Sequence, residues 1–563
     1  MKNIFEQLTD LLKKDERLVS QDGVLLKNQI QELARKNDSE LIKLLLSDKA
    51  IKQHFFFEVE KTLIFDKEKF IRFISNKQFL PDSYTAFKNK IGLIAGEEYL
   101  SENKEVVLAW PYRDCVLEGG MTKEDQKRDE IFYNETLAPD DINRLLEAKV
   151  FTNFKRIDKK GEHKLDGFKR DEKGAIKDNL IIKGNNLLAL ASLKKEFAGK
   201  MKLIYIDPPF NTDTDSFRYN DRFSRSTWLT FMKNRLELAR ELLHTEGSIF
   251  VHIDHNESHY LKVLLDTVFK EENFRNEIIW RYRRWPSPSK DFQKMHDIIF
   301  RYSRSGKWTW NQLYESKSES TLKAFGNIKL STEITDRGTV KKIKTDEISK
   351  GTNMSDVWES PMLQGSASKE REISDHFSTQ KPEQLIEKII SSATNEGDMV
   401  LDFFAGSGTT AATALKMKRQ FITIEQLEYI NDVTTERIKK VICGDQSGIS
   451  KNVNWKGGGD FVYMELAKWN EDWLEKIKKA KTGKELTELW NEMKDTAFLS
   501  YKVDPKTIDE NTKVFADLSI ADQKKFLIEC LDKNQLYVNL SEIEDREYGV
   551  SKENIRLNKE FYG

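Results

Sequence analysis

Apolar residues in the first 74 positions of the chain recur at helical spacing, with one short interruption. Leucines and isoleucines three or four residues apart form three runs within residues 8–45, and this spacing predicts amphipathic helices. Residues 55–65 have a strand-like pattern, and Phe70 and Phe73 favour one more helix. The segment contains no motif that indicates a reaction. We therefore expect residues 1–105 to form a helical interaction or dimerisation module.

From about residue 180 onward, short apolar strands alternate with amphipathic helices. The expected strands are residues 180–182, 203–206, 249–253, 399–404 and 421–425, and the expected helices include 228–243 and 257–269. This alternation is typical of a mainly parallel sheet with helices on both faces. The sequence therefore predicts an α/β fold with a doubly wound sheet, in which ligands bind at the carboxyl ends of the strands.

Three segments depart from this alternation. Residues 150–185 are highly charged and rich in Lys, Asp and Gly, which indicates a surface connection. Residues 306–375 are rich in Ser, Lys, Thr and Glu, and they resemble an insertion rather than another part of the sheet. Beyond residue 465 helical patterns return with a Lys/Glu-rich surface, which favours a separate C-terminal module.

Composition narrows the classes of function without selecting one. A chain of 563 residues is too long for one hydrophobic core, so about three to five domains are expected. The net charge of −1 gives no overall attraction to nucleic acid, and DNA binding would need local basic patches. No apolar run approaches the roughly 18 residues that cross a bilayer, and no secretory signal is evident. Cys115, Cys443 and Cys530 lie far apart along the sequence, so we expect neither disulfides nor a metal site. We therefore expect the protein to act in the reducing cytoplasm.

A turn with two glycines follows the expected strand at residues 399–404. Gly406 and Gly408 let the backbone turn sharply and let a ligand approach closely before a helix begins. The next strand ends at Glu425, whose carboxylate could accept hydrogen bonds from two ribose hydroxyls. A full G-x-G-x-x-G fingerprint and a G-x-x-x-x-G-K-[ST] loop are both missing from the sequence, which disfavours NAD and a P-loop ATPase. Taken alone, the turn could also be an ordinary strand-to-helix connection.

A second motif, Asp207-Pro208-Pro209-Phe210, ends the expected strand at residues 203–206. Proline cannot donate to a sheet ladder, so the strand must stop there, and the two rings stiffen the loop. The Asp207 carboxylate and the Pro208 carbonyl become two fixed acceptors, which suit the two N–H bonds of an exocyclic amine. Phe210 offers a flat apolar face on which a flipped base could stack. The alternative without a catalytic role is a strand end that is stiffened by proline, with Phe210 as an ordinary core residue.

Together these motifs resemble the amino-methyltransferase family of S-adenosylmethionine-dependent enzymes, whose sheet is Rossmann-like. Residues 207–210 match its [DNS]-P-P-[YFW] catalytic motif, and residues 404–408 match its F-x-G-x-G cofactor motif. Residues 379–382 resemble the T-x-K-P motif that helps to hold the amino-acid end of the cofactor. The catalytic motif comes before the insertion and the cofactor motif after it. This order is the mark of the β group, whose insertion is a target recognition region.

The resemblance extends to the modification subunit of type III restriction-modification systems. The segments that carry it are residues 110–120, 134–139, 448–459 and 532–538. It implies an N-terminal module (1–105), a catalytic half (106–305), a target recognition insertion (306–375), a cofactor-binding half (376–465) and a C-terminal helical module (466–563). Two residues depart from the pattern. Phe210 stands where tyrosine is commoner and so lacks a hydroxyl, and Phe403 stands where proline is frequent.

The reaction that this resemblance implies is direct displacement, in which an adenine amino nitrogen attacks the sulfonium methyl group without a covalent enzyme intermediate. The expected catalytic residues are Asp207, Pro208, Pro209 and Phe210. The expected cofactor-binding residues are Lys381, Asp402, Phe404, Gly406, Gly408, Thr409 and Glu425, with Lys381 near the cofactor carboxylate. The resemblance also implies a homodimer and a separate restriction subunit that hydrolyses ATP and cleaves DNA.

A target base inside a duplex must be flipped out, so the chain needs contacts to double-stranded DNA. Basic side chains interleaved with Trp285 lie just ahead of the insertion and suit phosphate contact and stacking. They are Arg281, Arg283, Arg284, Lys290 and Lys294. A solvated basic face would have the same composition.

Two other functions stay open on the sequence. An N4-cytosine methyltransferase uses the same fold and displacement, and only a tendency favours adenine when Asp stands first in the catalytic motif. A DNA-specificity module that has lost catalysis is the second alternative, although the intact Asp207, Gly406 and Gly408 argue against it. A chain that also cleaves DNA is less favoured, because the sequence contains no helicase motif.

Overall fold

The computed structural model describes residues 4–19, 25–59, 62–74, 94–95, 98–99, 145–212, 223–282, 290–317, 319–334, 340–359, 379–500, 503, 505–510, 512–532 and 535–563. The chain divides into two compact units. One consists of Met1–Gly119, Arg128–Val150 and Ala467–Gly549, and the other of Gly120–Lys127, Phe151–Leu466 and Val550–Gly563. The second unit contains both motifs.

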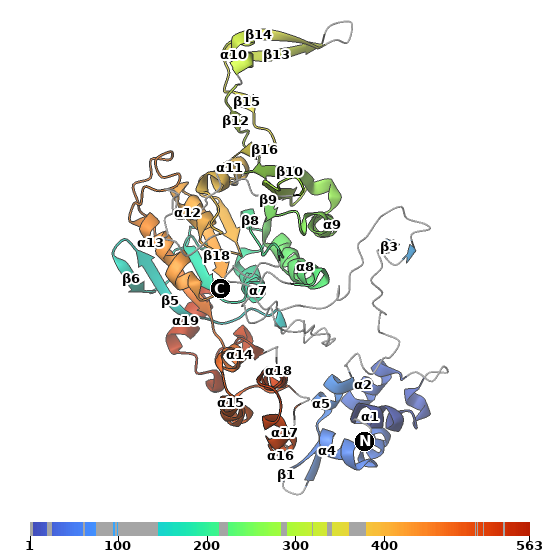
Figure 1. The fold of residues 1–563 in the computed structure, drawn as a ribbon. Helices are drawn as coiled ribbons and strands as arrows, with labels where there is room; N and C mark the ends of the chain where they lie inside the picture. Colours follow the sequence, from blue (N-terminus) through green and yellow to red (C-terminus); the bar gives the residue numbers. More distant parts are fainter. Residues whose placement is uncertain are drawn as a thin grey trace. The chain divides into compact units, whose positions relative to one another are not determined.

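The second unit is built on a large twisted sheet (Figure 1). Its central strands run parallel in the order β9-β8-β17-β18-β7-β19. Their bounds are β7 Asn179–Lys183, β8 Met201–Ile206, β9 Leu243–Ile253, β17 Met399–Asp402, β18 Gln420–Glu425 and β19 Phe461–Leu466. These strands are almost continuously buried, as expected where helices cover both faces of a parallel sheet. The predicted α/β fold is confirmed.

Antiparallel strands extend the sheet at both ends. One end adds β11 (His296–Ser303), β10 (Phe274–Arg281) and the short β16 (Val357–Glu359), which pairs in parallel with β10. The other end adds β5 (Phe151–Asp158) and β6 (Gly161–Lys164).

The prediction that residues 150–185 form a surface connection is therefore wrong for β5. This strand buries Phe151, Phe154 and Ile157, and the polar residues between them are partly or fully exposed. A bulge in β5 breaks the alternation of apolar and polar residues. Asn153 has a φ of 51°, and the pairing register with β19 shifts between Tyr463 and Glu465, so the apolar residues do not alternate strictly.

Two groups of helices cover the central strands, and Figure 1 shows them on opposite sides of the sheet. The first group is α7 (Asn186–Phe197), α8 (Arg225–Leu242) and α9 (Ser258–Phe269), and the second is α11 (Glu383–Ala393), α12 (Thr409–Lys416) and α13 (Glu436–Ile442). Leu203 and Tyr205 of β8 pack in one cluster with residues of α11, α12 and α13. Their neighbours along β8 point to the other face, because strand side chains alternate.

The strand order reverses between β8 and β17. From β8 the chain continues outward to β9, whereas from β17 it continues in the opposite direction to β18. The connections that leave the carboxyl ends of β8 and β17 therefore diverge and leave a crevice between them, which is where open α/β sheets bind ligands. The catalytic motif follows β8 and the glycine turn follows β17, so this topology brings the two motifs together.

The expected insertion contains small antiparallel pairs instead of further strands of the main sheet, apart from β16. The pairs are β12 (Tyr314–Glu315) with β15 (Thr352–Asn353), and β13 (Ile328–Ile334) with β14 (Val340–Ile348), and α10 spans Glu319–Phe325. The part of the insertion after residue 359 lies outside the described residues.

The N-terminal part of the first unit is helical, as predicted. It contains α1 (Ile4–Leu12), η1 (Glu16–Leu18), α2 (Lys27–Arg35), α3 (Ser39–Leu46), α4 (Lys49–Phe55), the hairpin β1 (Phe56–Val59) and β2 (Thr62–Phe65), and α5 (Lys67–Ile74). Its core includes the buried rings of Phe55, Phe70 and Phe73, which meet edge to face. Further along, β3 (Ile94–Ala95) and β4 (Glu98–Tyr99) form a short pair.

The C-terminal part of the first unit is also mainly helical. It contains α14 (Asn470–Lys479), α15 (Gly483–Thr496), α16 (Pro505–Glu510), α17 (Thr512–Ala516), α18 (Ile520–Cys530), η8 (Leu540–Glu542) and η9 (Arg546–Tyr548). The last helix, α19 (Lys552–Tyr562), belongs to the second unit, where Asn558 exchanges hydrogen bonds with both backbone groups of Phe151. The division of the chain into the five predicted domains stays a prediction.

Candidate active site

The catalytic motif lies at the carboxyl end of β8, on the crevice. Pro208 and Pro209 are buried, whereas Asp207 and Phe210 are partly exposed. The indole Nε1 of Trp228, at the start of α8, donates a hydrogen bond of 2.8 Å to the Pro209 carbonyl. Because proline also fixes φ, the direction of this loop is set by the two rings and by Trp228.

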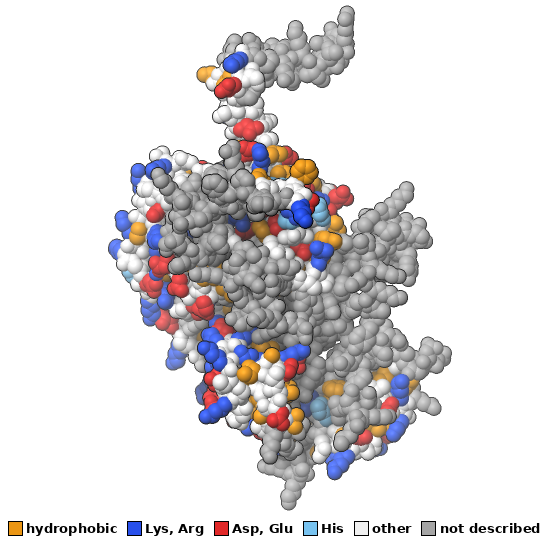
Figure 2. All heavy atoms as spheres, viewed as in Figure 1, with side chains coloured by type: hydrophobic (Ala, Val, Ile, Leu, Met, Phe, Trp, Pro, Cys, Tyr) orange, Lys and Arg blue, Asp and Glu red, His pale blue; other side chains and the backbone are white. Residues whose placement is uncertain are grey.

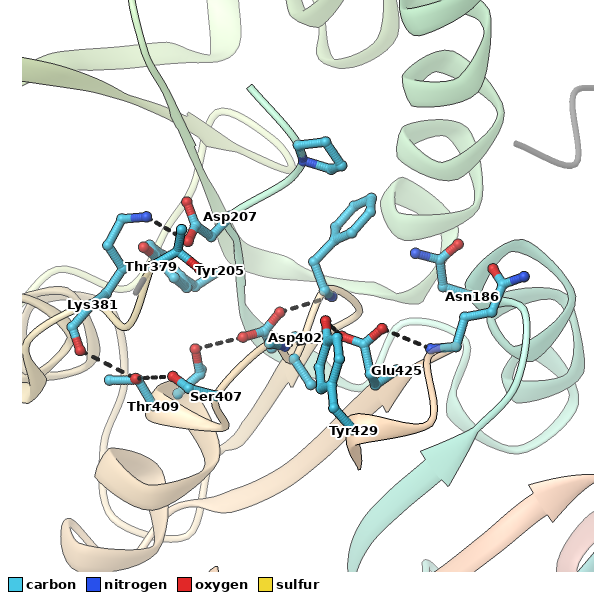
Figure 3. A pocket seen from close by; sticks show the side chains of 16 residues that line it. Asn186, Tyr205, Asp207, Thr379, Lys381, Asp402, Ser407, Thr409, Glu425 and Tyr429 are labelled. Carbon is cyan, nitrogen blue, oxygen red and sulfur yellow. Dashed lines mark hydrogen bonds and ion pairs between the residues drawn. The ribbon is translucent and has the colours of Figure 1, made fainter. Parts of the chain in front are cut away.

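The two carboxylate oxygens of Asp207 have different surroundings. Oδ2 lies 2.6 Å from Nζ of Lys381, two residues before the start of α11 (Figure 3). Oδ1 is buried and has no hydrogen-bond partner among the described residues. A buried acceptor without a donor costs free energy. This oxygen therefore marks a place where a ligand can supply an N–H or O–H group.

The glycine turn after β17 has the backbone conformation that the sequence predicts. Gly406 and Gly408 have φ values of 51° and 74°, in the left-handed region that favours glycine. A Cβ atom on Gly408 would lie 3.0 Å from Cγ2 of Thr434, so this position also has little room for a side chain. Phe404, just before the turn, packs against Phe231 of α8.

Asp402 ends β17 beneath the turn and is buried. Its carboxylate accepts hydrogen bonds from the Phe404 backbone N–H (3.0 Å) and the Thr410 hydroxyl (2.6 Å). Burial raises the pKa of Asp402 to about 7, the two hydrogen bonds oppose this shift, and the charges of Asp207 and Glu425 add to it. Asp402 thus shapes the turn from below and carries a proton more readily than an ordinary aspartate.

Glu425 ends β18 and lies beside the turn, as predicted. Its carboxylate accepts four hydrogen bonds, from the backbone N–H groups of Gly406, Gln426 and Leu427 and from the Tyr429 hydroxyl. Burial raises the pKa of Glu425, and these hydrogen bonds oppose the shift. A carboxylate has about four acceptor positions. A ribose hydroxyl that binds Glu425 would therefore replace one of these donors, and the Tyr429 hydroxyl is the one on a side chain.

Thr409 joins the glycine turn to the T-x-K-P segment. Its hydroxyl donates to the Lys381 carbonyl over 3.1 Å, and it also receives a hydrogen bond of 2.6 Å from Arg437. Lys381 therefore contacts the cofactor turn through its backbone and Asp207 through its side chain (Figure 3).

These groups line one cleft at the crevice between β8 and β17. The lining residues are Asn186, Tyr205, Asp207, Pro209, Thr379, Lys381, Asp402, Phe404, Ala405, Gly406, Ser407, Thr409, Thr410, Glu425, Gln426 and Tyr429. The cleft holds about 660 Å³ of empty space, part of it open to solvent. The glycines let a ligand approach the backbone closely, and Glu425 lies beside them. Oδ1 of Asp207 has no hydrogen-bond partner among the described residues. These groups together fit a nucleoside cofactor and an amine substrate.

A buried ion cluster beneath the turn was not predicted from the sequence. Glu383 of α11 accepts hydrogen bonds from Lys416 and from Arg437, and all three side chains are almost completely buried. Arg437 also contacts the backbone and hydroxyl oxygens of Ser407, so the cluster holds the turn from behind. Gly448 lies against Glu383, where a Cβ atom would come within 2.1 Å of its carboxylate.

A buried polar network behind Phe210 was also missed. His252 of β9 has Nδ1 3.0 Å from the Tyr205 hydroxyl and Nε2 3.2 Å from Asp297, which also accepts from the Tyr282 hydroxyl. Burial alone would raise the pKa of Asp297, but the contacts with His252, the charge of Lys381 and the Tyr282 hydroxyl together lower it. One signal was available in the sequence, namely a histidine within an otherwise apolar strand.

The expected DNA-binding residues are only partly described. Arg281 is exposed and forms an ion pair with Glu359, Lys290 is exposed, and Nζ of Lys294 lies 2.6 Å from Nε2 of His255. Arg283, Arg284 and Trp285 lie outside the described residues. Figure 2 shows basic and acidic side chains interspersed on the visible surface of the described part.

Comparison with known proteins assigns the family. Residues 201–436 match the family described as DNA methylase, and residues 38–93 match the type III restriction/modification enzyme methylation subunit. A protein of Haemophilus influenzae, named "Probable type III restriction-modification enzyme HindVI Mod subunit", is 33% identical over all of this chain and 98% of its own length. The chain belongs to the type III modification subunits.

Other relatives match parts of this modification subunit. The type III restriction-modification enzyme StyLTI Mod subunit of Salmonella typhimurium is 27% identical over 47% of this chain and 57% of its own length. Among solved structures, the M1.HpyAVI–SAM complex is 18% identical and covers 46% of this chain and 99% of its own, with a TM-score of 0.29.

The modification subunit is thus a DNA methyltransferase of a type III restriction-modification system, its cofactor is S-adenosylmethionine, and it works with a restriction subunit. Within the described ranges no helix is long and apolar enough to cross a membrane. No group of three His, Cys, Asp or Glu side chains in those ranges could hold a metal ion.

Proposed function

We propose that this modification subunit methylates the exocyclic N6 amino group of adenine in double-stranded DNA after the base has been flipped out. The observation that supports this most directly is the buried, unpartnered Oδ1 of Asp207 in the same cleft as the glycine turn. An exocyclic amine has two N–H bonds. Asp207 Oδ1 and the Pro208 carbonyl are the two acceptors that orient it, with the nitrogen lone pair directed toward the methyl group.

The reaction is a direct displacement. The amino nitrogen supplies the electron pair of the new N–C bond, and the C–S bond breaks with its electron pair going to sulfur. The sulfonium thereby becomes a neutral thioether, and the positive charge moves to the nitrogen, which then loses a proton to solvent. The negative charge of Asp207 beside the nitrogen stabilises the charge that develops there.

The cofactor-binding residues that we propose are Asp402, Phe404, Gly406, Gly408, Thr409 and Glu425. The glycines allow the backbone to approach the cofactor, Thr409 and Asp402 hold the turn, and Glu425 accepts from the ribose hydroxyls once the Tyr429 hydroxyl moves aside.

Phe210 is the proposed stacking face for the flipped adenine. It is partly exposed at the cleft, and its other side rests against His252. Stacking and hydrogen bonds in the pocket offset part of the cost of removing a base from the duplex. DNA phosphates are proposed to contact the basic segment that contains Arg281, Lys290 and Lys294.

We further propose a homodimer that acts in the cytoplasm, with the N-terminal helices as an interaction module. The family resemblance supports both statements. Sedimentation of the purified chain, with and without residues 1–105, tests the dimer and the role of that module.

The central test of the proposed function is Asp207→Ala. We expect this variant to lose methyl transfer in a tritiated-methyl assay while it still binds S-adenosylmethionine, because Asp207 lies on the substrate side of the cleft. Near-normal turnover would contradict the assignment of Asp207. Loss of cofactor binding would instead indicate that Asp207 shapes the cofactor site.

The base is tested by mapping methylated positions on a plasmid from cells that express the chain. N6-methyladenine at a fixed sequence supports the proposal, and N4-methylcytosine supports the alternative. An unmodified plasmid, together with normal cofactor binding in a titration, would favour a DNA-specificity module without catalysis.

A further inference from the structure

The side chain of Lys381 contacts the catalytic motif rather than the cofactor turn. Its ammonium lies 2.6 Å from Oδ2 of Asp207 and 4.9 Å from the centre of the Phe210 ring. Both partners of the ion pair are largely buried, with 13% and 22% of their side chains exposed. A charge-assisted contact of this length in a partly dry site fixes the plane of a carboxylate.

We infer that Lys381 is a positioning residue for Asp207: it holds Oδ2 so that Oδ1 alone faces the substrate amine. The inference rests on the proposed function of Asp207 and adds a role that the T-x-K-P resemblance does not give, since that motif assigns the lysine to the amino-acid end of the cofactor.

The distribution of charge around Asp207 explains why a cation is needed. Asp402 and Glu425 line the same cleft, and both are buried acids. A positive charge beside Asp207 reduces the repulsion between these neighbouring acids, and the Lys381 ammonium is the cation that lies 2.6 Å from Oδ2.

A hydrogen bond to the backbone of Lys381 fixes the position from which its side chain reaches Asp207. Its carbonyl accepts from the Thr409 hydroxyl, and Thr409 is the first residue of α12, directly after the glycine turn. The lysine therefore extends from the cofactor side of the cleft to the substrate side. In this arrangement one residue, Lys381, connects the catalytic motif to the residue that follows the glycine turn.

The two roles of Lys381 predict different measurements on the full-length modification subunit. If Lys381 positions Asp207, Lys381→Met lowers the single-turnover rate of methyl transfer at saturating cofactor and DNA by about 100-fold, the usual effect of losing one organising charge. The Kd of S-adenosylmethionine, measured by calorimetry without DNA, stays as in the wild type.

Chemical rescue separates a positioning role from a merely structural one. Lys381→Ala removes most of the side chain and leaves space for an ethylammonium ion, and we expect this ion to restore at least about a tenth of the lost rate, since the charge is what matters. Lys381→Arg keeps the charge and should retain more activity than Lys381→Met. Tetramethylammonium, which has no N–H group, should not rescue.

Lys202→Met is the matched control. Lys202 lies near the opposite end of β8, its side chain is 14% exposed, and it forms a similar ion pair with Glu246. We expect this variant to keep the wild-type rate and to show no response to ethylammonium. Thermal melting of every variant shows whether it is folded before its rate is compared.

Two results would overturn the inference. One is a higher Kd of Lys381→Met for S-adenosylmethionine together with a normal rate at saturating cofactor, which would place Lys381 at the cofactor carboxylate. The other is a lower rate that ethylammonium does not restore and that Lys381→Arg does not retain. Failure of the proposed function itself is distinguishable, because then the wild-type protein either methylates cytosine or transfers no methyl group to DNA.

Discussion

The imidazole of His252 lies against the ring of Phe210, with ring centroids 5.6 Å apart and planes inclined by 36°. Both ring nitrogens of His252 have partners, Tyr205 on one side and Asp297 on the other. The Asp297 carboxylate needs a donor, so we assign the proton to Nε2 and the accepting lone pair to Nδ1. The proposed stacking face of Phe210 thus rests on a ring that is held at both nitrogens.

We expect His252→Phe to destabilise the protein by about 2–3 kcal/mol, because a phenyl ring fills the same place but leaves the buried Asp297 without its ring donor. Urea unfolding gives this free energy. The affinity for S-adenosylmethionine should not change, because His252 is on β9, and β8 separates β9 from β17 and the glycine turn.

A double variant provides the control for His252. Replacing both partners, His252→Phe with Asp297→Leu, removes the unpaired buried charge, so the loss should be smaller than the sum of the two single losses. Strictly additive losses would show that the two side chains do not depend on each other.

Gly448 is required by the Glu383 carboxylate. We expect Gly448→Ala to destabilise the protein and to weaken cofactor binding, because its Cβ atom would lie 2.1 Å from a carboxylate oxygen that also contacts Lys416. Moving Glu383 would disturb Arg437, which holds the glycine turn through Ser407. Calorimetry with S-adenosylmethionine and urea unfolding measure the two effects.

Gly199→Ala is the matched control for Gly448→Ala. Its φ of 68° is close to the 56° of Gly448, but no atom lies within 4 Å of the added Cβ. We expect it to cost only the left-handed backbone penalty of about 1–2 kcal/mol and to leave cofactor affinity unchanged. Equal effects of the two substitutions would mean that backbone strain, and not the contact with Glu383, explains the loss.

The sequence predicted the parts of the site that depend on local chemistry. Asp207 stops a strand, Gly406 and Gly408 make a turn, and Glu425 ends the next strand, so residue type and neighbours indicate each role. Their assembly in one cleft followed from the strand–helix alternation, because parallel strands end at the same edge of the sheet.

The sequence could not predict contacts between side chains that are far apart along the chain. Glu383 and Arg437 are 54 positions apart, and Lys381 and Asp207 are 174 apart, so no periodicity connects them. The bulge at Asn153 likewise hid the strand β5, because strand interpretation assumes that side chains alternate.

Charge reversal of both Arg283 and Arg284 to Glu should weaken DNA binding and flatten its dependence on salt, because fewer counterions are released when fewer phosphates are neutralised. Fluorescence anisotropy with a DNA duplex at several salt concentrations measures both effects. Lys159 and Lys160, exposed in the hairpin at the other edge of the sheet, give the matched control pair. Identical binding curves for the wild type and the Arg283, Arg284 variant would remove this segment from the DNA interface.

Asp402 should make the stability of the protein depend on pH in the direction opposite to that of a salt-bridged aspartate. Its pKa is raised to about 7 in the folded state from an ordinary value of 3.8. Between these two values the folded protein holds a proton that the unfolded chain has released. The free energy of unfolding therefore falls as the pH rises through this window, and the loss is complete above about pH 7.

Asp402→Asn tests this dependence, because asparagine has the shape of the protonated acid and does not titrate. Its amide can donate to Thr410 while its oxygen accepts from the Phe404 N–H, so the turn keeps both contacts. We expect the variant to gain stability relative to the wild type as the pH rises from about 5 to about 8, in urea unfolding at each pH. Glu425 also has a raised pKa and is present in both proteins, so its own titration cancels in the difference, and only its interaction with the Asp402 charge remains. Parallel curves for the two proteins would show that Asp402 is already ionised when the protein is folded.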